Sequence, residues 1–310
     1  MMTDNSYLIV ENIFFENILE AVSLRAIKGD IISVVGESGS GKTSLLKCIA
    51  GFQNIKKGFI KLNNKILTDS KTFIKPNKRD IGFVFQNSPI FPHLSLKDNI
   101  ILNLSKKYLS NYEKIIKITN LNKIDNKFSH QVSGGELQRA SIATSLIREP
   151  NLLLLDEPFS NLDHFFKLKL INDIHLIIKN LNLTTILVTH DISDALSISN
   201  KILILKDGKV EQFDSPKNIY FNPKSFYVAS ISGRLNKIDK NKYIRPEDIV
   251  KVPKSDYKVS ILNSVFYGKE YLVTSLFKEN IWYFYNKVPL ENNENVFLDF
   301  DSVKILNLTN

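Results

Sequence analysis

The 310-residue chain has very little cysteine and no long apolar run. Its single cysteine, Cys48, excludes an internal disulfide and a cysteine-built metal site, and its place in the apolar stretch LLKCIAG predicts a buried, unreactive thiol. No stretch approaches the roughly eighteen apolar residues that a membrane-spanning helix needs. The opening residues, MMTDNSYLIVEN, do not place a basic region before an apolar one, so we expect a soluble chain that is not secreted.

The chain also lacks a long basic block, although its formal net charge is +9. Such an excess is compatible with an anionic partner, for example nucleic acid or a lipid surface. The lysines are scattered among asparagines and isoleucines, which favours a general compositional bias over a dedicated binding surface. Charge alone therefore decides nothing about partners.

No internal repeat or low-complexity linker interrupts the chain, and its length suggests one large domain followed by a small one. Apolar strands are expected at 31–35, 81–85, 152–155 and 184–189, with helices between them, which predicts a mostly parallel sheet. Turn signals at Asn63–Asn64 and Asp207–Gly208 predict hairpins that form an antiparallel annex. The pattern from about 87 to 150 is largely helical and indicates a helical subdomain.

The composition changes after Gly233. From Tyr243 onward the sequence contains short alternating runs, such as EYLVTSLF and NIWYFYNK, separated by turn-forming and charged residues. This spacing predicts a small all-β barrel or sandwich of about 70 residues. We therefore place one domain at 1–233 and a second at 234–310.

A glycine-rich loop lies between the strand expected at 31–35 and an apolar helix. Its glycines would let successive backbone N–H groups converge on phosphate oxygens, while the helix points its positive end at them. The lysine is then placed to reach the β- and γ-phosphates, and the threonine to bind Mg²⁺; a purely structural turn would need neither. The residues that match this P-loop pattern are Gly36, Glu37, Ser38, Gly39, Ser40, Gly41, Lys42 and Thr43, with Ser44 next in the helix.

Two acids and a histidine follow further strands of the expected sheet. The run at 152–155 has no polar alternation, and Asp156 and Glu157 emerge at its carboxyl end, where such sheets bind ligands. Asp156 is expected to be the Mg²⁺ partner of Thr43, because both would lie at the carboxyl edge of neighbouring parallel strands. Glu157 is expected to hold the attacking water, and His190 to donate to the γ-phosphate. A solvated acidic turn and a structural histidine are the alternatives.

These motifs resemble, over residues 7–233 and in the same order, the ATP-binding subunits of ABC transporters. VSGGELQRA is similar to the family signature, SNLD (which ends at Asp163) to its D-loop, Gln86 to its Q-loop and His190 to its switch histidine. The resemblance implies an α/β P-loop NTPase cassette with an antiparallel β annex and a helical subdomain. It also implies that ATP and Mg²⁺ bind, that Gln86 joins Thr43 and Asp156 at the metal, and that Glu157 is the general base.

In this family two cassettes meet head to tail, so the resemblance implies a homodimer or a paired cassette. The signature of one copy would present a hydroxyl, backbone amides and a helix start to a γ-phosphate bound by the partner's Lys42. Glu136 stands where the family more often has Gln, a variation that we expect to leave the phosphate contacts intact. Phe14 lies where the family has an aromatic that stacks on adenine; a core aromatic is the alternative. The signature residues in question are Ser133, Gly134, Gly135 and Glu136.

The tail resembles that of importer ATPases with a C-terminal β-barrel regulatory domain, which is OB-like. The likeness rests on FDSPKNIYFNPKSFYVASISGRLNKI and on the RPED element that begins at Arg245. That group serves binding-protein-dependent uptake of ferric iron, polyamines, thiamine, sulfate, molybdate and sugars, and this tail favours ferric iron or polyamines. Because the tail is shorter than the longer versions in the group, we expect no second barrel half.

The segment SPIFPHLSLKDNI, just after Gln86, matches the region through which such cassettes receive the coupling helices of membrane subunits. The implied partners are two multi-span membrane subunits and, indirectly, an extracytoplasmic substrate-binding protein. The implied location is the cytoplasmic face of the plasma membrane, as a peripheral subunit. A surface loop without a partner is the alternative for this segment.

Three other interpretations stay open. An exporter cassette shares every ATP motif but usually lacks the β-domain. A nucleic-acid or translation-associated ABC ATPase would suit the basic charge, but usually carries two cassettes or a long coiled-coil insertion, so we expect no nucleic-acid partner. Finally, the tail would only dimerise or stabilise the cassette, without sensing an effector.

Overall fold

The computed structural model describes residues 6–86, 90–160 and 163–308. The chain divides into two compact units, Met1–Pro216 and Lys217–Asn310, each with its own core. In the described parts of the chain, no helix combines the length and the apolar character that crossing a membrane requires.

The division after Pro216 lies earlier than the boundary expected after Gly233. Two short helices, α8 (Pro216–Phe221) and α9 (Phe226–Ser232), precede the strands of the second unit. They belong with those strands because the Arg245 guanidinium lies 3.9 Å from the centre of the Tyr220 ring and donates to the Ser232 hydroxyl at 2.9 Å. The composition changes only after these helices, so the sequence pattern alone did not reveal their packing.

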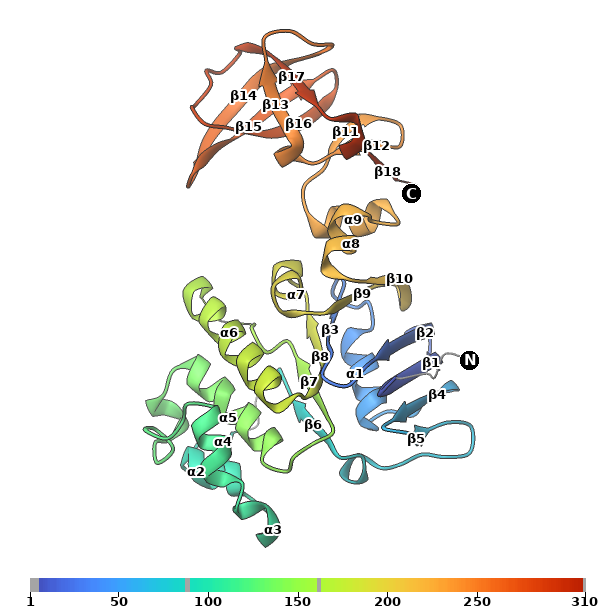
Figure 1. Cartoon of the computed structure of the whole chain (residues 1–310), viewed down its shortest axis with the longest axis vertical. Coiled ribbons are helices and arrows are strands. Elements are labelled where there is room, and N and C mark those ends of the chain that lie inside the picture. The colour runs from blue at the N-terminus through green and yellow to red at the C-terminus, as the bar shows by residue number, and fades with distance from the viewer. Residues whose placement is uncertain (1–5, 87–89, 161–162, 309–310) are drawn as a thin grey trace. The chain divides into compact units, whose positions relative to one another are not determined.

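The first unit is built on a six-stranded sheet with the order β10-β9-β3-β8-β7-β6, in which all neighbours except β9 and β10 are parallel (Figure 1). Leu152 and Leu154 face one hydrophobic core, and Leu153 and Leu155 face another. A strand covered on both faces needs apolar residues at every position, which explains the unbroken leucine run. The strands are β3 (Ile31–Val35), β6 (Ile81–Val84), β7 (Leu152–Asp156), β8 (Thr184–Thr189), β9 (Lys201–Lys206) and β10 (Lys209–Asp214).

The second sheet of this unit is the expected antiparallel annex, with the order β2-β1-β4-β5. Its hairpin turns at Asn63 and Asn64, whose φ values of 45° and 64° are those that a tight two-residue turn requires. The Asp207–Gly208 hairpin also forms, but it is not part of the annex: β9 pairs with β3, so the hairpin adds β10 to the central sheet. The annex strands are β1 (Leu8–Phe15), β2 (Leu19–Ala26), β4 (Lys57–Leu62) and β5 (Lys65–Thr68).

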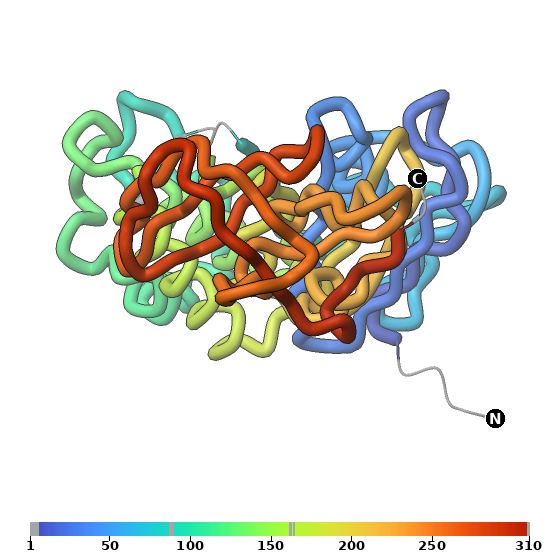
Figure 2. The backbone as a smooth tube through the Cα atoms, turned by 90° about the horizontal axis from the view of Figure 1, so that it is seen from above, coloured from blue at the N-terminus to red at the C-terminus, as the bar shows by residue number. Residues whose placement is uncertain are grey.

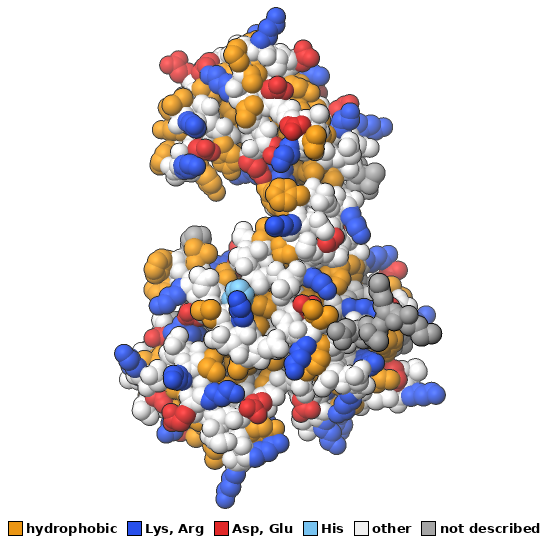
Figure 3. All heavy atoms as spheres, viewed as in Figure 1, with side chains coloured by type: hydrophobic (Ala, Val, Ile, Leu, Met, Phe, Trp, Pro, Cys, Tyr) orange, Lys and Arg blue, Asp and Glu red, His pale blue; other side chains and the backbone are white. Residues whose placement is uncertain are grey.

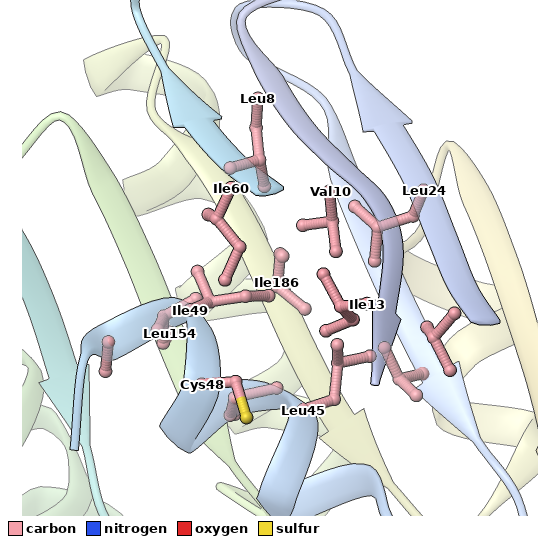
Figure 4. Packing of buried hydrophobic residues seen from close by; sticks show 14 of the residues in the cluster. Leu8, Val10, Ile13, Leu24, Leu45, Cys48, Ile49, Ile60, Leu154 and Ile186 are labelled. Carbon is pink, nitrogen blue, oxygen red and sulfur yellow. The ribbon is translucent and has the colours of Figure 1, made fainter. Parts of the chain in front are cut away.

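Helix α1 (Lys42–Ala50) packs between the annex and the central sheet (Figure 4). Its residues Leu45 and Ile49 meet Ile13 from the annex and Ile186 from the central sheet in one buried cluster. Each such side chain contributes roughly 1.5–3 kcal/mol when it is fully buried. Cys48 lies in the same cluster, and burial raises the pKa of its thiol to about 12, as expected for an unreactive cysteine. The helix that follows the P-loop is therefore anchored on two sides.

A helical segment follows β6 and forms a second core with helices α6 and α7. It lies at the opposite end of the first unit from the annex strands in both views (Figures 1 and 2). Helix α2 begins after Ser95, whose hydroxyl accepts a hydrogen bond from the Asp98 N–H. Residues 87–89 of the expected subdomain lie outside the described residues. The helices are α2 (Leu96–Ile101), α3 (Lys106–Leu109), α4 (Tyr112–Ile118), α5 (Gly134–Leu146), α6 (His164–Leu181) and α7 (Ile192–Ile198).

The second unit is all-β apart from its short helices, as predicted. Its strands form a three-stranded sheet, β11-β12-β18, and a five-stranded antiparallel sheet, β13-β17-β14-β15-β16, around the buried side chains of Trp282 and Phe284. Among the described strands, no ladder joins β13 to β16, so the barrel is not closed by hydrogen bonds. The strands are β11 (Asn236–Asp239), β12 (Lys242–Ile244), β13 (Ile249–Val252), β14 (Tyr257–Tyr267), β15 (Glu270–Phe277), β16 (Asn280–Asn286), β17 (Asn295–Phe300) and β18 (Leu306–Asn307).

The basic side chains are interspersed with acidic and neutral ones on the face that Figure 3 shows. Several are paired, including Arg25 with Glu11 at 2.9 Å and Lys209 with Glu20 at 3.0 Å. Exposed pairs of this kind contribute only about 0–1 kcal/mol each. On this face, the excess charge is dispersed, as the scattered lysines of the sequence indicated.

Candidate nucleotide site

The loop between β3 and α1 has the backbone conformation that phosphate binding requires. Gly39 and Gly41 have φ values of 84° and 100°, in the left-handed region that favours glycine. Gly36 has no room for a side chain, because a Cβ atom there would lie 2.1 Å from the Leu205 carbonyl oxygen. Helix α1 begins at Lys42, directly after this turn, so the loop lies at the positive end of the helix dipole.

The Lys42 ammonium folds back over this loop. Its Nζ atom donates to the carbonyl oxygens of Gly36 and Glu37, each at 2.8 Å. Burial lowers the Lys42 pKa, while the nearby carboxylates of Glu157 and Asp156 act in the opposite direction. An anionic acceptor such as a phosphate binds an ammonium more strongly than backbone carbonyls do, so Lys42 is well placed to move to one.

The rest of the loop has the features of a phosphate cradle. The Ser40 hydroxyl is buried and has no hydrogen-bond partner among the described residues, which is unusual for a buried polar group. Ser38 and Gly39 are exposed, and a Cβ atom on Gly39 would have no heavy atom within 4 Å, so the outer side of the loop is open. Ser44 is half-buried in the first turn of the helix. These residues fit a bound phosphate group.

Thr43 and Asp156 are paired: Thr43 Oγ1 donates to Asp156 Oδ1 at 3.0 Å. The reason expected for this pairing was wrong, because β3 and β7 are not neighbours and β8 lies between them. The residues meet because α1 packs across both β7 and β8 and carries Thr43 to the end of β7. Burial raises the pKa of Asp156. A hydroxyl beside one carboxylate fits Mg²⁺, which takes few protein ligands and completes its shell with phosphates and water.

Glu157 brings together two residues that are far apart in the sequence. Its Oε2 atom accepts a hydrogen bond from Gln86 Nε2 at 3.0 Å and lies 3.5 Å from His190 Nδ1. Its φ of 46° is uncommon for a side chain of this size, and strained residues of this kind cluster at functional sites. The three residues line one pocket of about 340 Å³. The acid, the amide and the imidazole are therefore in mutual reach, as a shared chemical role requires.

The signature residues form a helix start. Ser133 is the N-cap of α5, and Gly134 and Gly135 are its first residues. Ser133 is engaged by Glu136, whose carboxylate accepts from its N–H at 2.8 Å and from its hydroxyl at 2.9 Å. The hydrogen bond from the Ser133 backbone is the main cause of a lowered Glu136 pKa. Ser133 is exposed, and a Cβ atom on Gly135 would meet no heavy atom within 4 Å, so this helix start is open to a ligand.

The nucleotide contacts expected for Phe14 and Asp163 stay predictions. Phe14 lies in β1, half-buried, with the Lys57 ammonium 5.6 Å from the centre of its ring, and its stacking on adenine stays a prediction. Asp163 is the N-cap of α6 and accepts from the Phe166 N–H at 3.2 Å. Asn161 and Leu162 of the SNLD segment, and Ser88 and Pro89 of SPIFPHLSLKDNI, lie outside the described residues.

An ion cluster that the sequence did not predict lies beside His190. Lys167 of α6 contacts Asp191 at 2.6 Å and Asp194 at 2.7 Å, and both Lys167 and Asp194 line the pocket of Glu157. Asp191 and Asp194, which follow His190 in the sequence, indicated negative charge at this place. The sequence did not indicate Lys167 as their cation, because Lys167 lies on a different helix and only the tertiary fold brings it there.

A parallel sheet with a P-loop leading into α1, and with Asp156 at the end of a buried strand, defines the class of P-loop nucleoside triphosphatases. Within that class, a family model described as "ABC transporter" matches residues 19–160. The spermidine/putrescine import ATP-binding protein PotA of Bacillus cereus is 35% identical over 242 residues, which cover 75% of this chain and 72% of that protein. The chain therefore belongs to the ABC transporter family, as an ATP-binding cassette.

Other relatives carry similar names. The Fe(3+) ions import ATP-binding protein FbpC of Fusobacterium nucleatum is 36% identical over 230 residues, and a PotA protein of Legionella pneumophila is 37% identical over 240. The matches cover 72% and 75% of this chain, and 61% and 65% of those two proteins. The chain thus spans less than two thirds of the length of either one.

Solved structures show the same cassette fold. The cbiO1 protein of Clostridium perfringens, part of the ABC transporter complex cbiONQ, has a TM-score of 0.64 and 25% identity, and the match covers 70% of this chain and 91% of that one. A dimeric ATP-binding cassette bound to ADP and Pi after hydrolysis has a TM-score of 0.56 and 27% identity, with 67% and 98% covered. The expected fold class is confirmed.

Proposed function

We propose that this chain is the ATP-hydrolysing subunit of a binding-protein-dependent ABC importer. One observation carries the proposal: adjacent carboxylates at the end of β7 have separate partners. Asp156 pairs with Thr43 of the P-loop helix, and Glu157 meets Gln86 and His190. A site that must bind Mg²⁺ and also activate a water needs this division of roles.

The roles follow from the positions. Lys42 and the amides of the loop bind the β- and γ-phosphates, and Thr43 with Asp156 holds Mg²⁺, which neutralises phosphate charge when it is bound. Glu157 accepts the proton of the attacking water. His190 stabilises charge that develops on the γ-phosphate, and Gln86 orients Glu157 and reports the state of the metal site.

The active form is a head-to-tail dimer of this chain, or a pair with another cassette. The helix start at Ser133 supports this proposal, because Ser133 and Gly134 are exposed and a helix start suits the γ-phosphate held by a second copy. The dimeric assembly of the post-hydrolysis cassette, a homologous structure, supports it as well.

The partners are two multi-span membrane subunits and, through them, an extracytoplasmic substrate-binding protein. This places the chain at the cytoplasmic face of the plasma membrane, as a peripheral subunit. The exposed Phe91 ring, just after Gln86 in the chain, supports docking to a membrane subunit. The import names of the relatives favour an importer over an exporter, and they support ferric iron or polyamines as the substrate class. The second unit would act as a regulatory domain.

A reconstitution experiment tests this function. The chain would be co-expressed with candidate membrane subunits, and the purified complex placed in vesicles with the cognate substrate-binding protein inside or outside. ATP-dependent uptake of ferric iron or of a polyamine, lost with Lys42→Ala, is the expected result. ATP hydrolysis without co-purifying membrane subunits would point instead to a non-transport ATPase.

A further inference from the structure

Lys167 connects two segments of the site that the proposed function uses separately. It lies one turn into α6, and its backbone N–H donates to the Asp163 carbonyl oxygen at 2.9 Å. Its side chain leaves the helix and reaches Asp191 Oδ2 at 2.6 Å and Asp194 Oδ1 at 2.7 Å. One residue thus contacts the start of α6 through its backbone and the start of α7 through its ammonium group.

The two aspartates hold the turn that carries His190. The Thr189 hydroxyl donates to Asp194 Oδ2 at 3.0 Å and accepts from the Asp191 N–H at 3.1 Å. Asp191 also accepts from the Ser193 N–H at 2.9 Å, which caps α7. His190 therefore stands between two residues, Thr189 and Asp191, whose positions depend on the cluster around Lys167.

The Lys167–Asp194 pair is largely buried, whereas the Asp191 side chain is 35% exposed. The side chains of Lys167 and Asp194 are 19% and 4% exposed. Burial works against the charge on Lys167, but its hydrogen bonds to Asp191 and Asp194 raise its pKa above the ordinary value. Burial also raises the Asp194 pKa, whereas the Asp191 pKa is lowered by Lys167 despite burial. A charge pair with little water around it has one favoured geometry, so it fixes the turn better than an exposed pair.

The His190 side chain itself has few restraints. It is 59% exposed, and its ring nitrogen Nδ1 lies 3.5 Å from Glu157 Oε2, beyond a short hydrogen bond. The cluster around Lys167 therefore restrains the backbone from which the imidazole extends. A displacement of about 1 Å at a reacting group can cost about 100-fold in rate.

We propose that Lys167 is a positioning residue that ties the start of α6 to the His190 turn and so holds the imidazole in its working place beside Glu157. This inference rests on the proposed ATPase function. In a paired cassette, movement of Asp163 would be passed to the His190 turn through the Lys167 side chain.

The test compares Lys167→Met with Lys167→Arg in the full chain. Met keeps the length and loses the charge, whereas Arg keeps the charge. We expect the Met variant to lower kcat for ATP hydrolysis by about 10- to 100-fold, with KM for ATP changed less than about twofold, since Lys167 does not touch the P-loop. We expect the Arg variant to recover most of kcat. Lys169→Met, an exposed neighbour on the same helix, is the control and should match the wild type.

The outcomes separate this inference from the function on which it rests. If wild-type chain hydrolyses ATP and Lys167→Met has the same kcat, the positioning role is overturned. If kcat/KM fell only because KM rose, the substitution would have weakened ATP binding, and the positioning role would be overturned too. If the Met variant does not fold, the double variant Lys167→Met with Asp194→Asn removes the unpaired buried charge and is assayed in its place. If the wild-type chain has no ATPase activity, either alone or with its membrane subunits, the proposed function itself is wrong.

Discussion

At the scale of single residues, the chain turn at Glu157 separates two carboxylates that are adjacent in the sequence. Asp156 ends β7 with its side chain on Thr43, and Glu157, at a positive φ, turns its carboxylate to Gln86 and His190. Asp156 is 5% exposed and its pKa is raised by burial. In the proposed function, the partners of each acid, more than its chemical type, decide which one would hold the metal and which one would activate the water.

The first prediction concerns the general base. Glu157→Gln should lower ATP turnover by about 10²- to 10⁴-fold while ATP binding is retained, because the amide keeps the shape and the contacts but cannot accept the proton. The variant should accumulate as an ATP-bound dimer. Turnover would be measured by phosphate release and assembly by light scattering.

Glu113→Gln, an exposed acid on α4, is the control for this change. Normal hydrolysis by Glu157→Gln would show that another residue is the base. Loss of nucleotide binding would instead assign Glu157 to the phosphate or metal contacts.

Glu136 shows how a substitution within a motif is accommodated locally. As a carboxylate it closes a capping box with Ser133, which satisfies two donors at the start of α5. The same contact engages the Ser133 hydroxyl that a γ-phosphate would use. For the phosphate contacts to stay intact, the Ser133 hydroxyl must therefore be shared between Glu136 and the phosphate, or released by Glu136, when a second copy binds.

At the scale of elements, helix α1 is fixed at both ends. Its first turn follows the glycine loop, and its last turn ends at Gly51, whose φ is 82°. The buried Arg79 donates to the carbonyl oxygens of Cys48 and Ile49 at 3.1 and 2.8 Å, and to the Thr68 hydroxyl of the annex at 2.6 Å. The Arg79 guanidinium thus caps the last turn of α1 together with the Gly51 N–H, which donates to the Cys48 carbonyl oxygen at 3.2 Å.

The second prediction follows from this contact. Arg79→Leu should lower the free energy of unfolding of the first unit by about 2–4 kcal/mol, because several buried acceptors lose their donor. Urea unfolding followed by circular dichroism would measure the change. Arg148→Leu, which removes an exposed arginine, is the matched control and should change stability by less than about 0.5 kcal/mol. Equal stabilities for the two variants would contradict the capping role of Arg79.

The third prediction concerns the turn before α2. The Phe91 ring is 45% exposed, while its backbone is held by the buried Asn99 through bonds of 2.8 and 3.1 Å. Phe91→Ala should reduce coupled transport more than it reduces basal ATP hydrolysis, because the fixed turn presents the ring to a partner and not to the nucleotide. Uptake and ATPase rates would be measured on the same reconstituted complex.

Leu109→Ala on α3 is the control for Phe91→Ala, since Leu109 is also 45% exposed. Unchanged transport with Phe91→Ala would count against this docking surface. If Phe91→Ala lowered basal ATP hydrolysis as much as transport, we would instead assign Phe91 to the nucleotide site.

At the scale of the whole molecule, we propose that a second copy completes the site. Lys42, Thr43, Asp156, Glu157 and His190 meet around the end of the central sheet. Ser133 instead makes its hydrogen bonds to Glu136 and Leu137 on its own helix. In the proposed head-to-tail dimer, each copy would supply one half of each of two sites.

The fourth prediction tests that arrangement. Ser133→Arg should abolish ATP-dependent dimerisation and lower turnover at least about tenfold, while a dilute monomer still binds ATP with unchanged affinity. The reason is that the substitution blocks the partner's phosphate and leaves the chain's own P-loop untouched. Ser110→Arg, at an exposed serine, is the control. Weaker ATP binding by the monomeric Ser133→Arg variant would place Ser133 in the chain's own site.

Much of the first unit was predictable because its signals are local. The glycine loop, the unbroken apolar run of β7 and the Asn63–Asn64 turn depend on neighbours in the sequence, and each formed where expected. The Asp207–Gly208 hairpin formed as well, but its membership of the central sheet did not follow from the sequence, because pairing between β9 and β3 joins segments far apart. The role of α8 and α9 in the second unit was hidden for the same reason.

The sequence by itself determined the P-loop, the acids after β7 and the all-β tail, since spacing and residue type suffice to encode turns, buried strands and helix starts. Only the tertiary structure decided which of these residues meet. It placed β8 between β3 and β7, brought Thr43 to Asp156 across it through α1, gathered Gln86 and His190 on Glu157, and set Lys167 against two aspartates. Such contacts depend on how helices pack across a sheet, and packing is settled by the whole core at once and not by any one segment.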